Sequence, residues 1–156
     1  MQKINKIEDY FHKGFVLEYP SLVLPWKAPL NDLASASGGI WNSDRYYWRA
    51  TKFLGGLEYP LMSKAGITKE APFKEITALV GIDPNTGLWS DSRSLRGFEY
   101  VSQHLFNLIG APSNQSSSES TSEPYVSWES QSIHIYLGII EMHCYRCNLT
   151  IAYLEE

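Results

Sequence analysis

The order of predicted elements repeats once along this chain, and this repetition constrains the fold more than any other feature of the sequence. Each half contains one helical segment, a loop, a strand that carries a tryptophan, and two further strands. In the first half these segments are residues 29–36, 45–51, 57–61 and 73–81, and in the second half they are residues 94–109, 124–128, 133–141 and 148–154. A shared order with unequal loops is typical of duplication, because loops absorb length changes at little cost in free energy.

Two alignments express the repetition in residue numbers. Trp48 and Trp128 lie 80 residues apart, and the last strands of the two halves align with an offset of 74, which places Glu75 opposite Leu149. The sequence therefore predicts one α+β domain over residues 1–156, with repeat one at about 22–84 and repeat two at about 92–156. We expect two helix-plus-three-strand repeats to form an antiparallel sheet with the helices packed on one face.

The clearest single element is a helix over residues 94–109. Its apolar residues recur at intervals of three and four and form one stripe: Leu95, Phe98, Val101, Leu105, Leu108 and Ile109. This spacing is typical of an amphipathic helix that covers a sheet. Ser92 or Ser94 can cap its start, and Gly110-Ala111-Pro112 ends it.

Other segments have simpler patterns. Apolar residues at helical spacing predict a short helix before Gly14, and residues 15–19 and 21–24 are predicted to be extended. Alternation predicts a terminal hairpin that turns near residues 143–147, with a bulge at Gly138. Residues 113–123 contain no apolar side chain and six serines, which predicts a mobile loop or a segment that becomes ordered on binding.

Charge and hydropathy exclude several classes of function. The formal net charge is -4 at pH 7, whereas nucleic-acid binding draws on clustered lysine and arginine. Residues 1–9 lack the apolar core of a secretory signal, and no stretch approaches the roughly 18 apolar residues of a membrane span. We therefore expect a cytoplasmic protein that binds neither nucleic acid nor membrane, and whose acidic balance suits a basic partner.

Cys144-Tyr145-Arg146-Cys147 is the one motif that could carry chemistry. A redox dithiol usually places its first cysteine at a helix start, whereas this motif precedes a predicted strand. A structural zinc site needs four ligands, and the chain has no second cysteine pair, although His134 and His143 lie near in sequence. A turn with two reduced thiols is the favoured interpretation, and a redox or metal role stays as the alternative.

Known catalytic patterns are absent from the sequence. There is no H-E-x-x-H, no G-x-S-x-G, no P-loop and no G-x-G-x-x-G. Residues 81–87 have ordinary turn chemistry rather than that of a metal loop. We therefore expect no catalytic residue, no cofactor and no metal, with a small enzyme or metabolite-binding domain assembled from scattered residues as the alternative.

The sheet face without helices is the predicted binding surface. If Tyr46, Trp48 and Ala50 face the helices, strand alternation turns their neighbours outward. The candidate partner-binding residues, including one acidic residue at the rim, are Arg45, Tyr47, Arg49, Glu58, His134, Tyr136 and Glu141. Tyrosine and arginine dominate interface energetics because each buries a large area and still offers a hydrogen-bond donor.

Several segments of the chain carry a resemblance to known domains. Leu24-Pro25-Trp26 precedes the first short helix, residues 48–57 read Trp-Arg-Ala-Thr-Lys-Phe-Leu-Gly-Gly-Leu, and Gly110-Ala111-Pro112 stands before Trp128 and the terminal hairpin. Over residues 22–154 this pattern resembles the tandem helix-and-sheet repeats of beta-lactamase-inhibitor-like and small outer-membrane-assembly-protein-like domains. The resemblance implies that the chain binds another protein across its sheet.

The chain departs from the secreted members of that group in two respects. It lacks an export signal, and it lacks the cysteine pairs that accompany export. By analogy, a cytoplasmic and acidic relative is most similar to an immunity protein. Such a protein would block a cognate bacterial toxin, basic in charge and for example a nuclease, by stoichiometric binding.

Overall fold

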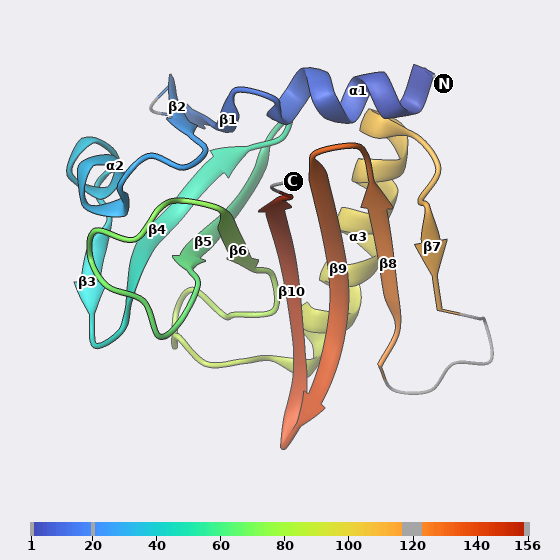
Figure 1. Cartoon of the computed structure of the whole chain (residues 1–156). Helices are drawn as coiled ribbons and strands as arrows, with labels where there is room; N and C mark the ends of the chain where they lie inside the picture. The colour runs from blue at the N-terminus through green and yellow to red at the C-terminus, as the bar shows by residue number, and fades with distance from the viewer. Residues whose placement is uncertain (1, 20, 117–122, 155–156) are drawn as a thin grey trace.

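The chain forms a mixed α+β structure with one antiparallel sheet (Figure 1). The computed structural model describes residues 2–19, 21–116 and 123–154, and these contain three helices and ten strands. The helices are Gln2–Phe11 (α1), Leu30–Ser37 (α2) and Asp91–Ile109 (α3). The strands are Gly14–Tyr19 (β1), Ser21–Pro25 (β2), Ile40–Asn42 (β3), Arg45–Phe53 (β4), Leu57–Ser63 (β5), Glu75–Leu79 (β6), Asn114–Gln115 (β7), Tyr125–Glu129 (β8), Ile133–Met142 (β9) and Cys144–Tyr153 (β10).

The strand order places the last strands of the two predicted halves side by side. It runs β2-β1-β4-β5-β6-β10-β9-β8-β7, and β3 pairs with β4 beside this path. Each half is therefore an antiparallel meander, β4-β5-β6 or β8-β9-β10, and the two meanders meet where β6 pairs with β10. Hairpin β1–β2 adds to the outer edge at β4, in a position that the repeat hypothesis does not include.

One face of the sheet is covered by helices and carries the core. Helix α3 packs against β9 and β10, and α1 contacts both α3 and β9. In Figure 1, α3 lies behind β8, β9 and β10. The strand residues that point toward α3 are almost fully buried, as Ile135, Leu137, Leu149 and Ile151 show. Strand alternation sends the intervening side chains to the opposite face, called the open face below.

The register corrects the sequence alignment of the two final strands. Leu149 pairs with Ala78 and Ile151 pairs with Ile76, and all four side chains are buried toward the helices. An offset of 74 residues would instead match Ile76 with Thr150, which lies on the open face. Equivalent residues of two repeats must lie on the same face of the sheet. The residues buried toward the helices are even-numbered in β6 and odd-numbered in β10, so only an odd offset between the two strands is possible and the predicted alignment is wrong.

Helix α3 starts earlier than its apolar stripe predicts. Ser90 is the N-cap, because its side chain accepts a hydrogen bond from the Arg93 N–H at 3.3 Å. Ser94 does not cap the helix but is fully buried against β10. Leu95 is 47% exposed, so the buried stripe begins at Phe98 rather than at Leu95.

The register shifts within the pairings that β4 makes with β1 and with β5, whereas β9 is regular. Trp48 pairs with Leu61 and Thr51 pairs with Tyr59, so Arg49 and Ala50 together oppose only Pro60. Strict alternation from Tyr47 would place Thr51 on the open face, but the bulge moves Thr51 to the helix-covered side. The predicted bulge at Gly138 is wrong, because β9 keeps an unbroken register with both β8 and β10.

The remaining predictions agree with the structure in outline. The opening helix, the extended segments before Trp26 and the short helix near residue 33 all form, and the terminal hairpin turns at His143 alone. Within the predicted loop 113–123, residues 114–115 form β7, whereas residues 117–122 lie outside the part of the chain that the structure describes. Among the described helices, none is both long and apolar enough to cross a membrane.

Candidate functional site

A row of six side chains crosses the open face from one half of the molecule to the other. Each member is the direct cross-strand partner of the next: Tyr47, Met62, Thr77, Thr150, Tyr136 and Ser127. The row lies on six neighbouring strands, and at its centre the hydroxyls of Thr77 and Thr150 are 3.0 Å apart and hydrogen-bonded. This central row ties the two halves together and ends in a tyrosine region on each side.

The Tyr136 end of the row is an ordered aromatic surface. The Tyr136 ring lies over Gly138, where an added Cβ would come within 2.6 Å of the ring, so glycine leaves the space that the ring fills. Tyr125 stacks on Tyr136 with ring centroids 5.7 Å apart. Partial burial, with smaller contributions from Tyr125 and Glu123, raises the pKa of Tyr136 above its usual value. The hydroxyl is therefore a neutral donor and acceptor at physiological pH.

Beside the central row the open face is hollowed into a groove of about 440 Å³, called the arginine groove below. Strands β4, β5 and β10 contribute most of its polar and aromatic lining, and the segment between β6 and α3 contributes Trp89. The residues that matter for its chemistry are Arg45, Tyr47, Met62, Trp89, Arg146 and Asn148. The size lies within the range of small-molecule sites in proteins.

Arg45 is held at one side of the groove by several contacts. Its Nε donates to Asp44 Oδ1 at 3.0 Å, its Nη1 lies 3.6 Å from Met62 Sδ, and its guanidinium is 6.0 Å from the centre of the Tyr47 ring. Hydrogen bonding by Arg45 holds the pKa of Asp44 below its usual value, and the Gly66 N–H helps. The charge of Arg45 is therefore compensated within the chain.

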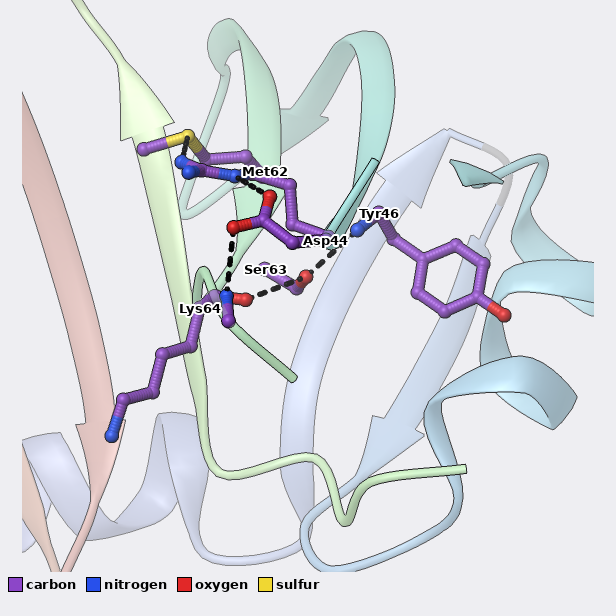
Figure 2. A network of polar contacts seen from close by, with 7 residues as sticks. Asp44, Tyr46, Met62, Ser63 and Lys64 are labelled. Atoms are coloured by element: carbon purple, nitrogen blue, oxygen red, sulfur yellow. Dashed lines mark hydrogen bonds and ion pairs between the residues drawn. The ribbon is translucent and has the colours of Figure 1, made fainter. Parts of the chain in front are cut away.

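Figure 2 shows how the start of β4 at Tyr46 and the end of β5 at Ser63 are joined. The Ser63 hydroxyl accepts a hydrogen bond from the Tyr46 N–H at 2.9 Å and donates to the Lys64 carbonyl at 3.3 Å. Ser63 is only 1% exposed, so this pairing satisfies a buried hydroxyl. It also sets the start of β4 against the end of β5, which positions Arg45 over the groove.

Arg146 lies at the other side of the groove and has a different environment. Its guanidinium is 5.5 Å from the centre of the Trp89 ring. Its Nε is buried without a hydrogen-bond partner, and so is Oδ1 of Asn148, which follows two residues later on the same face of β10. Among the residues that the structure describes, no carboxylate pairs with Arg146.

The structure brings together most of the residues that the sequence indicates for partner binding. Five of these residues lie on the open face, because each belongs to the central row or stands an even number of residues from the row member on its own strand. They are Arg45, Tyr47, Glu58, His134 and Tyr136. His134 lies 3.5 Å from Glu129, its cross-strand partner.

Two of the predicted residues lie elsewhere. Arg49 is exposed within the β4 bulge rather than in a regular pair. Glu141 is exposed near the end of β9. It stands two and four residues after Ile139 and Leu137, so strand alternation places it on the same helix-covered side as these two residues. The prediction assigned Glu141 to the rim of the open face, and the regular alternation of β9 places it at the back of that rim.

The cysteine motif lies inside β10 rather than in a turn. Three residue steps along the strand separate Cys144 from Cys147 by about 10 Å and send their side chains to opposite faces. A disulfide needs Cα atoms within about 7 Å, so the two thiols cannot bridge without rebuilding the strand. Both are free cysteines, and Cys147 is fully buried.

Thiol labelling of the native protein is expected to modify Cys144 and spare Cys147. Burial raises the pKa of the Cys147 thiol to about 12, which removes the reactive thiolate at neutral pH. Ellman's reagent should therefore titrate one thiol in native buffer and two in urea, and Cys144→Ser should abolish the native reaction. Equal reaction rates at both cysteines in the folded protein would contradict this placement.

The sequence did not single out Arg146, Asn148 and Trp89 as site residues. The alternation of β10 carried a usable signal, because Cys147 and Leu149 are apolar while Arg146 and Asn148 are polar. The predicted turn over residues 143–147 removed Arg146 from that pattern. Trp89 lies in the segment between β6 and α3, which contacts β10 only in the folded protein. No local sequence pattern indicates this contact.

The comparisons with known proteins found no match to a protein-family model, a curated protein or a solved structure. The functional argument therefore comes from the geometry of the open face.

Proposed function

We propose that this protein binds another protein across the open face and acts as an immunity protein that blocks a cognate bacterial toxin in the cytoplasm. The observation that carries the proposal is the central row, which runs over six strands of the open face, with the half-buried Tyr47 at one end and the partly exposed Tyr136 beside Ser127 at the other. Rigid tyrosines supply contact area at low entropic cost, which favours their use in recognition.

Charge supports a basic partner such as a nuclease. The chain has a net charge of -4, and exposed Glu58 lies on the open face while Glu141 lies behind its rim. Complementary charge speeds encounter and disfavours wrong partners more than it adds affinity. Stoichiometric binding across a broad sheet would cover the toxin's active site. Such inhibition requires no catalytic residue in this chain.

We also propose that the two halves arose by duplication of a helix-plus-three-strand unit. Two buried tryptophans support this, since each donates its indole N–H to the C-terminal end of the preceding helix. Trp48 donates to Ser37 Oγ at 2.8 Å, and Trp128 donates to the Gly110 carbonyl at 2.9 Å. Superposition of the halves tests the idea, because Trp48 and Trp128 must then coincide together with their helix ends.

Replacing both Tyr47 and Tyr136 with alanine is expected to abolish binding of the partner while the fold persists. Truncation of central interface tyrosines costs about 2 kcal/mol or more each, or roughly a thousandfold in affinity for the pair. The test is a pull-down from the native host with wild-type and variant bait, followed by binding measurements on the recovered protein. In co-expression with the toxin, the wild type should restore growth and the variant should not.

The matched control is Tyr100→Ala, because Tyr100 is a tyrosine that is 59% exposed on α3, away from the open face. This variant should bind the partner like the wild type. The proposal is wrong if the double variant retains full affinity, or if Tyr100→Ala weakens binding to the same degree.

A further inference from the structure

We propose that the arginine groove is a binding site for a carboxylate whose neighbouring atom carries a hydrogen-bond donor. The inference does not depend on the proposed function, because the groove is formed by this chain alone. It rests on three properties of one place: an uncompensated arginine, an unsatisfied amide oxygen beside it, and an aromatic wall that orients the guanidinium.

Arg146 requires an anion more than Arg45 does. Both arginines line the groove, but Arg45 already forms an ion pair with Asp44 at 3.0 Å. The Arg146 guanidinium lies beside the Trp89 ring, its side chain forms no ion pair or hydrogen bond with the residues that the structure describes, and its Nε–H is buried without an acceptor. Arginine stays charged in proteins, so its buried N–H gains free energy from a ligand that accepts a hydrogen bond.

The shape of the guanidinium indicates a carboxylate. The Nε and one terminal nitrogen form a planar edge with two parallel donors, and a carboxylate accepts both with its two oxygens. The centre of the Trp89 ring lies 5.5 Å from the guanidinium carbon, so the ring restricts the plane in which this edge can turn. A ligand bound there would lie flat along the groove.

Asn148 adds a second requirement. Its Oδ1 is buried and has no donor, although it lines the same groove two residues from Arg146. A carboxylate alone cannot satisfy an acceptor, so the ligand must bring its own N–H or O–H next to the acid group. A 2-hydroxy acid or an amino acid has this pattern as a free molecule, and the C-terminal residue, with its own backbone N–H beside the terminal carboxylate, has it in a polypeptide.

Titration with lactate is expected to shift the Arg146 Nε–H resonance and the Trp89 indole resonance in a saturable way at millimolar concentrations. Lactamide, which lacks the charge, and propanoate, which lacks the hydroxyl, should each bind about tenfold more weakly, since each loses one hydrogen-bonding requirement. N-acetylalanine is the probe for a polypeptide C-terminus, with N-acetylalaninamide as its neutral control. Whichever acid binds more tightly identifies the source of the carboxylate.

Two variants complete the experiment. Arg146→Gln should remove saturable binding of both acids, whereas Arg96→Gln, which removes an exposed guanidinium on α3, should bind like the wild type. The inference is wrong if neither acid binds saturably, if the neutral amides bind as tightly as the acids, or if inorganic phosphate binds more tightly than either acid. The comparison of ligands on the wild-type protein decides the matter even if Arg146→Gln fails to fold. Loss of toxin binding by Tyr47 and Tyr136 variants is measured separately, so either proposal can fail alone.

Discussion

Replacing Trp128 with alanine is expected to destabilise the protein by about 3–5 kcal/mol, which is the usual range for removing a buried tryptophan. Trp128 is 1% exposed and lies on the helix-covered face of β8, opposite Ile135. Its indole N–H also donates to the Gly110 carbonyl at 2.9 Å, where α3 ends. The substitution therefore creates a cavity in the core and also removes the hydrogen bond to the C-terminal end of α3. Urea denaturation with an unchanged slope measures the effect.

Trp128→Phe separates these two contributions. Phenylalanine retains most of the apolar volume but loses the N–H, so we expect a loss of about 1–2 kcal/mol. Leu88→Ala is the control for a large apolar residue at the surface, because Leu88 is 67% exposed, and its effect should stay within about 0.5 kcal/mol. A loss below about 1 kcal/mol for Trp128→Ala would contradict the packing described here.

Periodicity predicted the parts of the fold whose burial is set by local geometry. The apolar stripe of α3 and the alternation of β9 and β10 both follow from one face meeting the core, and Val101, Leu137 and Leu149 are fully buried as that pattern requires. The same alternation predicted that Tyr47 and Tyr136 face away from the helices. The antiparallel sheet and the side that the helices cover were therefore accessible from sequence.

The strand register and the contacts between segments distant in sequence could not be predicted in this way. The β4 bulge depends on pairing with β5, and nothing local in Arg49-Ala50 indicates it. The arginine groove needs Trp89 to return to Arg146, 57 residues later in the sequence, and to lie beside its guanidinium. Side-chain pairs formed by such long-range contacts leave no periodic signal, so the open face could be predicted but its groove could not.

Replacing Gly81 with alanine is expected to destabilise the protein by about 2–4 kcal/mol through crowding against α3. An added Cβ would lie 2.0 Å from Ser94 Oγ and 3.2 Å from the Cys147 backbone nitrogen. Ser94 is fully buried, and its hydroxyl donates to the Tyr145 carbonyl at 2.8 Å and accepts from the Cys147 N–H at 3.2 Å. The new methyl group must displace this hydroxyl or separate α3 from β10. Chemical denaturation of the variant measures the cost.

A double-mutant cycle with Ser94→Ala tests this cause directly. Ser94→Ala alone should cost about 2 kcal/mol, because it leaves a buried carbonyl and a buried N–H without their partner. In the double variant the clashing oxygen is gone, so the total should fall short of the sum of the single effects by about 1–2 kcal/mol. Gly87→Ala is the control, since Gly87 has φ +71° and nothing within 4 Å of an added Cβ, and should cost only the backbone strain of about 1 kcal/mol. Strict additivity of the Gly81 and Ser94 effects would show that the two residues do not share this contact.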